Sequence, residues 1–180
     1  MRKKTILVVQ GGISNEREIS LKSGKACIKA LKKLKNKVLL FDPARENLSK
    51  IKKYKENVDL IFNALHGRDG EDGIAQSYFE YFKIPYTHSG VTSSMNAMDK
   101  IILKKKFKKN KILTPNYFSV NSVNYKQFLK EKFLTRLNFN YPMVVKPSNE
   151  GSSIGVEMCK NFNQLKRSVI KLIKNYKTLI

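Results

Sequence analysis

Three polar segments of this chain contain residue types that could bind or transform a ligand. They are residues 11–18, 66–73 and 146–155, and each follows a short apolar run that is typical of a buried strand. Open α/β sheets bind ligands beyond the carboxyl ends of their strands, which is where such loops lie. We therefore expect the chemistry of the protein in these three loops.

The first loop combines the paired glycines Gly11 and Gly12 with the carboxylates Glu16 and Glu18. Paired glycines allow a tight backbone turn after a strand. Carboxylates at a helix start are favoured by the helix dipole, by roughly 0.3–1 kcal/mol each, so a purely structural role is one interpretation. The loop lacks the GxGxxG spacing, and its carboxylates would repel a pyrophosphate. A functional carboxylate here would instead bind a cation, such as the ammonium group of a substrate.

The second loop gathers three glycines, three carboxylates, an arginine and the histidine His66 within eight residues. Its carboxylates could bind calcium, but the EF-hand spacing and the bidentate glutamate at the twelfth position are absent. A helix N-terminus would explain Asp72 and Gly73 but would leave His66 and Arg68 without a role. This imbalance favours a functional loop.

The third loop follows an apolar run that ends at Lys146. Its small and hydroxyl-bearing residues offer backbone N–H groups that can bind phosphate oxygens, and Lys146 would add a point charge. It is not a Walker A loop, because no GK[ST] sequence opens a following helix. A plain hairpin turn is the alternative, but the lysine that closes the apolar run favours a phosphate role.

Apolar periodicity predicts the elements that position these loops. Strands are expected at residues 5–10, 37–41 and 58–63, with a helix between the first two, which predicts a parallel sheet with helical crossovers. The inward face of that helix is expected to contain the apolar and small residues Ser20, Ser23, Gly24, Cys27, Ala30, Leu31 and Leu34. Later elements are expected as helices at residues 91–109 and 123–132, strands at 117–120, 143–146 and 156–159, and a last helix capped by Asn161 and Gln164.

Net charge is the most unusual property of the composition. The chain of 180 residues has 36 Lys and Arg against 14 Asp and Glu, a net charge of +22, which usually suggests a nucleic acid or a membrane surface as partner. Only six of these cations are arginine, whereas proteins that bind the phosphate backbone use more arginine beside aromatic residues. We therefore expect salt-sensitive, non-specific adhesion to polyanions, and the lysine-rich residues 104–111 are expected to be a solvated face.

Other features of the composition exclude several classes of protein. No apolar run exceeds four residues, so neither a transmembrane helix nor a signal peptide is predicted. Cys27 and Cys159 are 132 positions apart and form no CxxC or Cys/His cluster, which predicts neither a disulfide framework nor a zinc site. A cytoplasmic location fits these observations best.

Together, the three loops and two further segments resemble the D-alanine–D-alanine ligases of the ATP-grasp superfamily. The matching segments, in the order and at the spacing of the family, are residues 11–20, 64–73, 85–90, 98–100 and 145–155. The resemblance implies an α/β fold with an open parallel sheet in a Rossmann-like (preATP-grasp) substrate domain, residues 1–96. The first, incomplete part of an α+β ATP-grasp domain would follow in residues 97–180.

The resemblance also implies an activity. ATP would phosphorylate the carboxylate of one D-alanine, and the amine of a second D-alanine would attack the acyl phosphate, which yields the dipeptide used in peptidoglycan. An alternative is another ATP-grasp ligase, such as one that joins D-alanine to D-lactate. Outside the enzymes, the alternative is a basic nucleic-acid-binding protein.

Roles for individual residues follow from the resemblance alone. Glu16 would bind the ammonium group of the first D-alanine, His66 would lie near that substrate, and Ser152 would hydrogen-bond toward Glu16, so that Glu16 and Ser152 act in catalysis. Lys100 and Lys146 would contact the phosphates of ATP. The mobile loop that covers these phosphates would include Glu150, Gly151, Ser152 and Ser153.

The resemblance further implies what lies outside this sequence. Family members bind Mg²⁺ through carboxylates that follow the third loop at a distance, and after Lys146 this chain has only Glu150 and Glu157. We therefore expect that this sequence contains no metal ligands and that it is an N-terminal portion of a ligase. We also expect that this portion alone is inactive. Expected partners are D-alanine, ATP and a second copy of the chain, bound through the first domain, without specific nucleic acid or membrane insertion.

Overall fold

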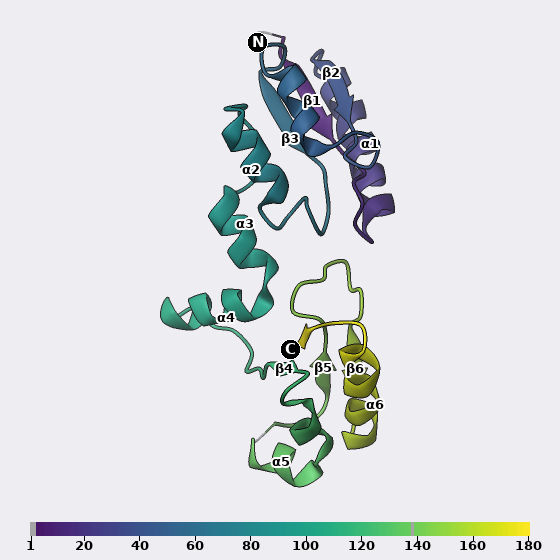
Figure 1. Cartoon of the computed structure of the whole chain (residues 1–180), viewed down its shortest axis with the longest axis vertical. Coiled ribbons are helices and arrows are strands. Elements are labelled where there is room, and N and C mark those ends of the chain that lie inside the picture. Colours follow the sequence, from purple (N-terminus) through teal and green to yellow (C-terminus); the bar gives the residue numbers. More distant parts are fainter. Residues whose placement is uncertain (1–2, 138) are drawn as a thin grey trace. The chain divides into compact units, whose positions relative to one another are not determined.

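The computed structural model describes residues 3–137 and 139–180 (Figure 1). Over these residues the chain forms two compact units, which divide between Ala97 and Met98. The interpretation of the first unit as a substrate domain, and of the second as part of an ATP-grasp domain, stays a prediction.

The first unit is built on a parallel sheet with the strand order β2-β1-β3. The central strand β1 (Thr5–Val9) pairs in parallel with β2 (Lys37–Phe41) on one side and with β3 (Leu60–Asn63) on the other. Helix α1 (Arg17–Lys33) connects β1 to β2, and the 3-10 helix η1 (Leu48–Tyr54) lies between β2 and β3. The prediction of an α/β fold with a parallel sheet and a helical crossover is confirmed.

Strand β1 is buried on both faces of this sheet. Leu7, Val8 and Val9 have no exposed surface, which explains why the strand is a continuous apolar run rather than an alternating one. Leu7 and Val9 belong to a core cluster to which η1 and helix α2 (Ile74–Tyr81) also contribute. Burial of such a side chain stabilises the fold by roughly 1.5–3 kcal/mol.

Helix α1 approaches the sheet through a narrow face of small residues. Ser20 and Gly24 are its buried residues, and a Cβ atom on Gly24 would lie only 2.0 Å from Oε1 of Gln10. The predicted inward face is therefore correct at its small-residue end. It is wrong further along, because Ala30 is exposed and Leu34 is 71% exposed. The close approach of α1 to the sheet at Ser20 and Gly24 sets the orientation of the helix. The spacing of apolar residues in the sequence does not predict this orientation.

The second unit contains two antiparallel strand pairs. β5 (Met143–Val145) pairs with β6 (Glu157–Cys159), and β4 (Val120–Asn121) pairs with β7 (Thr178–Leu179). The hairpin predicted around the third loop is thus present. The strand predicted at residues 117–120 is shorter than expected and lies at the end of that range.

Backbone hydrogen bonds between Lys146 and Ile180, at 2.8 and 3.0 Å, join the two strand pairs. Helix α6 (Phe162–Ile173) packs against β5, β6 and β7 and buries its apolar face there. It begins as predicted, because Oδ1 of Asn161 accepts a hydrogen bond from the backbone N–H of Gln164 at 3.0 Å.

The prediction of one helix over residues 91–109 is wrong. Helix α3 (Val91–Met98) ends before Asp99, and helix α4 (Lys100–Lys109) begins after it. Asp99 has an extended backbone, and its carboxylate accepts hydrogen bonds from two backbone N–H groups of the next turn, at 2.8 and 3.2 Å. Aspartate is among the strongest N-cap residues, so it starts a new helix here.

The prediction of a helix over residues 123–132 is also wrong. The 3-10 helix η2 (Tyr125–Leu129) and the short helix α5 (Glu131–Arg136) replace it. Oδ1 of Asn124 accepts a hydrogen bond from the backbone N–H of Asn121 at 2.8 Å. Such local side-chain bonds compete with helical hydrogen bonds at the point where the helix was expected to begin.

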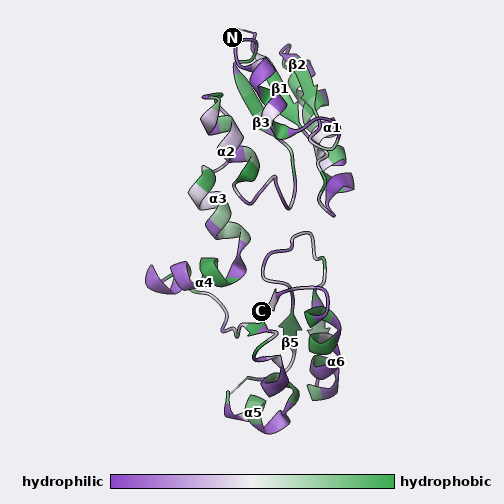
Figure 2. Cartoon of the chain, in the orientation of Figure 1, coloured by the Kyte–Doolittle hydropathy of each residue, from purple (hydrophilic) through white to green (hydrophobic). Residues whose placement is uncertain are grey.

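The surface of α4 agrees with the expectation of a solvated lysine face, with one exception. Figure 2 shows much of this helix as hydrophilic, and most of its lysines are exposed, but Lys104 is half-buried. None of the helices in the described part of the chain is long and apolar enough to cross a membrane.

The first loop is held to the end of β2 by an ion pair. Arg17 donates from Nη1 and Nη2 to the two carboxylate oxygens of Asp42, at 3.0 and 2.8 Å. Burial alone would raise the pKa of Asp42, but hydrogen bonds from Arg17 and from the backbone N–H groups of Gly12 and Ala44 outweigh it and lower the pKa from 3.8 to about 2. A carboxyl group with a lowered pKa stabilises the fold above its unfolded-state pKa, and this contribution disappears as the pH falls through the folded-state value.

We expect Asp42→Asn to lower the free energy of unfolding by about 2 kcal/mol at pH 7, because the ionised carboxylate is lost. The difference between the variant and the unchanged protein should shrink as the pH falls from 4 toward 2. Urea denaturation followed by circular dichroism across this range measures it. Glu56→Gln, which removes an exposed carboxylate, is the matched control. Parallel pH profiles for Asp42→Asn and the unchanged protein would contradict this account.

Candidate functional site

The first and second loops meet within the first unit. The hydroxyl of Ser20 donates a hydrogen bond to the carbonyl of Ala64 at 2.7 Å and accepts one from the backbone N–H of Gly11 at 2.8 Å. Gly11 follows β1 and Ala64 follows β3, so one serine of α1 connects the ends of two strands. The hydroxyl of Ser14 adds a hydrogen bond to the carbonyl of His66 at 2.7 Å.

Glu16 lies at this junction and is buried, with an exposed fraction of 3%. It stands at the N-cap position of α1, but its side chain makes no capping hydrogen bond, which argues against the structural interpretation of this carboxylate. A Cβ atom on Gly67 would lie 2.3 Å from Oε2 of Glu16, so the carboxylate lies directly against the backbone of the second loop. A buried carboxylate is costly unless it has a partner, and a small cation would be a suitable one.

His66 lies between two polar side chains. Its Nε2 is 3.0 Å from Oγ of Ser23, and its Nδ1 is 3.4 Å from Oε1 of Glu71. These three residues line a pocket of about 400 Å³ in the first unit. The sequence analysis did not identify either residue as a partner of His66. Ser23 was assigned only to the inward face of a helix, and Glu71 was considered only as one of the carboxylates that could bind calcium.

Two further charged residues of the second loop, Asp72 and Arg68, make contacts within the loop or at the start of α2. The carboxylate of Asp72 accepts hydrogen bonds from the backbone N–H groups of Asp69 and Ile74, at 3.0 and 3.2 Å, so the helix-start interpretation holds for this residue. Arg68 has a side chain that is 79% exposed and lies 3.7 Å from Asp69. Within residues 3–137 and 139–180, no group of three or more His, Cys, Asp or Glu residues could hold a metal ion.

The third loop is bound to the start of α4. The backbone N–H of Lys100 donates to the carbonyl of Ser148 at 2.9 Å, and its Nζ donates to the carbonyls of Ser148 and Glu150. Lys100, predicted to contact phosphates, and Glu150, predicted to belong to the loop that covers them, are thus brought together within the second unit.

The tip of the third loop has an unusual backbone. Ser152 and Ser153 have φ values of 44° and 62°, and Gly155 has a φ of 68°. The left-handed conformation costs a non-glycine residue roughly 1–2 kcal/mol, and such residues concentrate in segments that bind or enclose ligands. Gly155 is also required by space, because a Cβ atom there would lie 2.9 Å from Cγ of Pro147.

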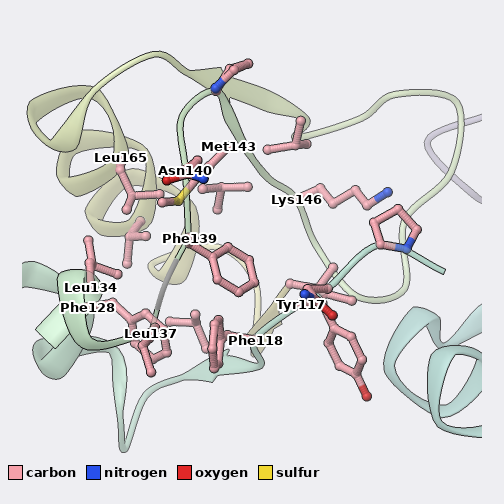
Figure 3. A pocket seen from close by; sticks show the side chains of 18 of the residues that line it. Tyr117, Phe118, Phe128, Leu134, Leu137, Phe139, Asn140, Met143, Lys146 and Leu165 are labelled. Atoms are coloured by element: carbon pink, nitrogen blue, oxygen red, sulfur yellow. The ribbon is translucent and has the colours of Figure 1, made fainter. Parts of the chain in front are cut away.

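A second pocket, of about 560 Å³, lies in the second unit (Figure 3). Lys146 and Tyr117 lie toward one end in this view, and apolar side chains such as Phe128 and Leu134 lie toward the other. Its wall therefore combines a cation with aromatic and aliphatic surface. A ligand with a flat apolar part and an anionic part fits such a wall.

Lys104 also lines this pocket and was assigned wrongly to the solvated face. Its Nζ donates to Oγ1 of Thr114 at 2.6 Å and lies 5.4 Å from the ring centroid of Tyr117. Burial lowers the pKa of Lys104, and the positive charges of Lys146 and Lys108 lower it further. An anion bound here would relieve the repulsion among these lysines.

The predicted site residues thus form two groups, one in each unit. The loops that contain Glu16 and His66 meet in the first unit, while Lys100, Lys146 and the loop with Ser152 belong to the second. The expected approach of Ser152 to Glu16 stays a prediction.

Two family models match the chain. Residues 42–89 match the model described as D-ala D-ala ligase N-terminus, and residues 107–180 match D-ala D-ala ligase C-terminus. The chain is 51% identical to the D-alanine–D-alanine ligase of Pelagibacter ubique over 178 residues, which are 98% of the chain and 56% of that relative. It is 40% identical to the corresponding ligase of Zymomonas mobilis over 99% of the chain and 54% of that relative.

Solved structures of D-alanine–D-alanine ligases are also similar to the chain. The D-alanine–D-alanine ligase of Bacillus anthracis matches with a TM-score of 0.80 and 30% identity, over 98% of this chain and 56% of that one. A second structure of that ligase, complexed with ATP, matches with a TM-score of 0.79 and 28% identity, over 98% and 57%. The chain spans about half the length of the curated relatives it matches.

We expect Gly67→Ala to destabilise the first unit by about 2–3 kcal/mol, because alanine is strained at a φ of 68° and its Cβ would displace the carboxylate of Glu16. In a Glu16→Ala background the second contribution should vanish and the cost should fall by 1 kcal/mol or more. Urea denaturation of the four variants of this double-mutant cycle measures the coupling.

Gly12→Ala is the matched control for this cycle. Gly12 has a φ of 75°, but the nearest atom to its added Cβ is Cδ2 of Leu65 at 3.2 Å. It should show no coupling to Glu16→Ala. If the effects of Gly67→Ala and Glu16→Ala simply add, the contact between the two loops is not as described.

Proposed function

The chain belongs to the D-alanine–D-alanine ligase family, and from this we propose that the whole protein joins two D-alanines in an ATP-dependent reaction. The observation that carries the proposal is the buried carboxylate of Glu16, which lies against Gly67, the residue that follows His66 in the second loop. A buried carboxylate that does not cap its helix is suited to bind the ammonium group of an amino acid.

The proposed reaction has two steps. The γ-phosphoryl group of ATP is transferred to a carboxylate oxygen of the first D-alanine, which gives D-alanyl phosphate and ADP. The amine of the second D-alanine then attacks the carbonyl carbon, the C–O bond to phosphate breaks, and D-alanyl-D-alanine and inorganic phosphate leave after the amine loses a proton. Both steps depend on positioning and on neutralisation of charge, which are contributions that fixed side chains can make.

Glu16 and His66 are proposed to hold the first D-alanine. An ion pair with Glu16 would fix the amino end of the substrate and leave its carboxylate to be phosphorylated. Ser152 is proposed to hydrogen-bond toward Glu16 when substrate is bound. The left-handed backbone of Ser152 supports a loop that can change conformation.

ATP is proposed to bind in the second unit. The pocket that contains Lys146 and Tyr117 offers a cation for the phosphates and an aromatic and aliphatic wall for the base. Lys100 would contact the phosphates, and the loop with Glu150, Gly151, Ser152 and Ser153 would cover them. Lys104 adds a further positive charge at the pocket, which the sequence analysis did not predict. Phosphoryl transfer from ATP also uses Mg²⁺, whose ligands we propose to lie in the remainder of the whole protein.

Other properties that the resemblance implies remain part of the proposal. They are a role in peptidoglycan synthesis, a homodimer formed through the first unit, and a cytoplasmic location. Ligation of D-alanine to D-lactate is the alternative within the family, and the described residues do not favour either second substrate.

A coupled assay of ADP formation tests the proposed activity. We expect the whole protein to form ADP when D-alanine is added and residues 1–180 alone to form none, because the described residues supply no cluster of metal ligands. Product analysis distinguishes the dipeptide from the D-lactate ester. The lack of D-alanine-dependent ADP formation by the whole protein would refute the ligase proposal, and turnover by residues 1–180 would refute the inactivity of this portion.

Glu16→Gln in the whole protein tests the substrate site. We expect KM for D-alanine to rise tenfold to a hundredfold, because a hydrogen bond to a charged group contributes roughly 1.5–3 kcal/mol, while KM for ATP changes little. Steady-state kinetics with each substrate varied in turn measures both constants. Glu18→Gln, two residues along and exposed, should behave like the unchanged protein. An unchanged KM for D-alanine in Glu16→Gln would remove Glu16 from the site.

A further inference from the structure

The contact between Ser23 and His66 suggests a role for a residue that no motif identifies. Ser23 lies in the middle of α1, 43 positions before His66, and its Oγ is 3.0 Å from Nε2 of the imidazole. We propose that Ser23 is a positioning residue: in the neutral imidazole of His66 it donates a hydrogen bond to Nε2 and favours the tautomer that has its proton on Nδ1.

The chemistry of the two partners supports this assignment. A neutral imidazole has one N–H donor and one nitrogen acceptor, and an ionised carboxylate can only accept. Glu71, 3.4 Å from Nδ1, therefore favours the proton on that nitrogen. Nε2 is then an acceptor, and the hydroxyl of Ser23 is the donor that faces it. The opposite tautomer would direct the lone pair of Nδ1 at the carboxylate and is disfavoured.

Both backbones that carry this contact are fixed independently of it. The hydroxyl of Ser20, one turn before Ser23, is bonded to the carbonyl of Ala64, two residues before His66. The carbonyl of His66 itself accepts a hydrogen bond from Ser14. The freedom that remains is rotation of the imidazole about its side-chain bonds, and this is what Ser23 and Glu71 restrict.

The ring is held at a place where a ligand can reach it. The side chain of His66 is 31% exposed, and His66, Ser23 and Glu71 all line the pocket of the first unit. In many sites, a hydrogen bond to one ring nitrogen fixes the tautomer and the orientation of a functional histidine. The link from the orientation of His66 to the binding of D-alanine rests on the proposed function, whereas the hydrogen bond itself does not.

Nitrogen-15 NMR of the histidine side chains tests the hydrogen bond without any assay of activity. We expect the two ring nitrogens of His66 to report a protonated Nδ1 and an unprotonated, hydrogen-bonded Nε2 when the spectrum is recorded at a pH at which the imidazole is neutral. Ser23→Ala should move the Nε2 signal and mix the tautomers, and Ser23→Thr, which keeps the hydroxyl, should restore the original signals. The chain has two histidines, so His88→Gln assigns the spectrum.

Ser93→Ala is the matched control, because Ser93 lines the same pocket and is exposed. It should leave the signals of His66 unchanged. Circular dichroism of each variant verifies that it is folded, and alanine is well tolerated in a helix. Signals of His66 that are identical in Ser23→Ala and in the unchanged protein would overturn the proposal.

Kinetics of the whole protein test the consequence for the substrate. We expect Ser23→Ala to raise KM for D-alanine about threefold to tenfold with little change in KM for ATP, and Ser23→Thr to restore it. If NMR detects the change of tautomer but KM for D-alanine is unchanged, the positioning role toward this substrate is refuted. If the whole protein has no ligase activity, the proposed function fails, and the NMR result still decides whether Ser23 positions His66.

Discussion

A single hydroxyl group determines how the candidate site of the first unit is assembled. Ser20 donates to the carbonyl of Ala64 and accepts from the N–H of Gly11, so it satisfies polar groups at the ends of β3 and β1 at once. Buried backbone groups of this kind must be paired, and here the partner is provided by α1. The helix is thereby fixed against both strand ends, and Glu16 and Ser23, on either side of Ser20, reach the second loop.

The second unit holds positively charged side chains close to apolar surface. Lys146 is fixed through its backbone by Ile180, and Lys104 is held by Thr114 and by the ring of Tyr117. The burial that lowers the pKa of Lys104 also prevents water from screening its charge fully.

Much of the fold was predictable, because its signals are local. The apolar run of β1 identified a buried strand, and the pair Asn161 and Gln164 identified the start of α6. The predictions were wrong where a polar side chain competes with the helix, as at Asp99 and Asn124, since hydrophobic spacing does not register such hydrogen bonds.

The contact of Ser23 with His66 and the burial of Lys104 could not be predicted, because they depend on tertiary packing. The individual roles of Glu16, Ser152, Lys100 and Lys146 were inferred from the resemblance, and they remain proposals.

The long separation between the partners in the first unit has a consequence for how the chain acquires its structure. Ser14 and His66 are 52 positions apart, and the partners Ser20 and Ala64 are 44 apart. The chain loses entropy when such a loop closes, before the contact can contribute any favourable free energy. Pairs of this separation therefore form late relative to a helix or a turn. A nascent chain would therefore complete α1 early, and the pocket beside His66 would take shape only after β3 has joined the sheet.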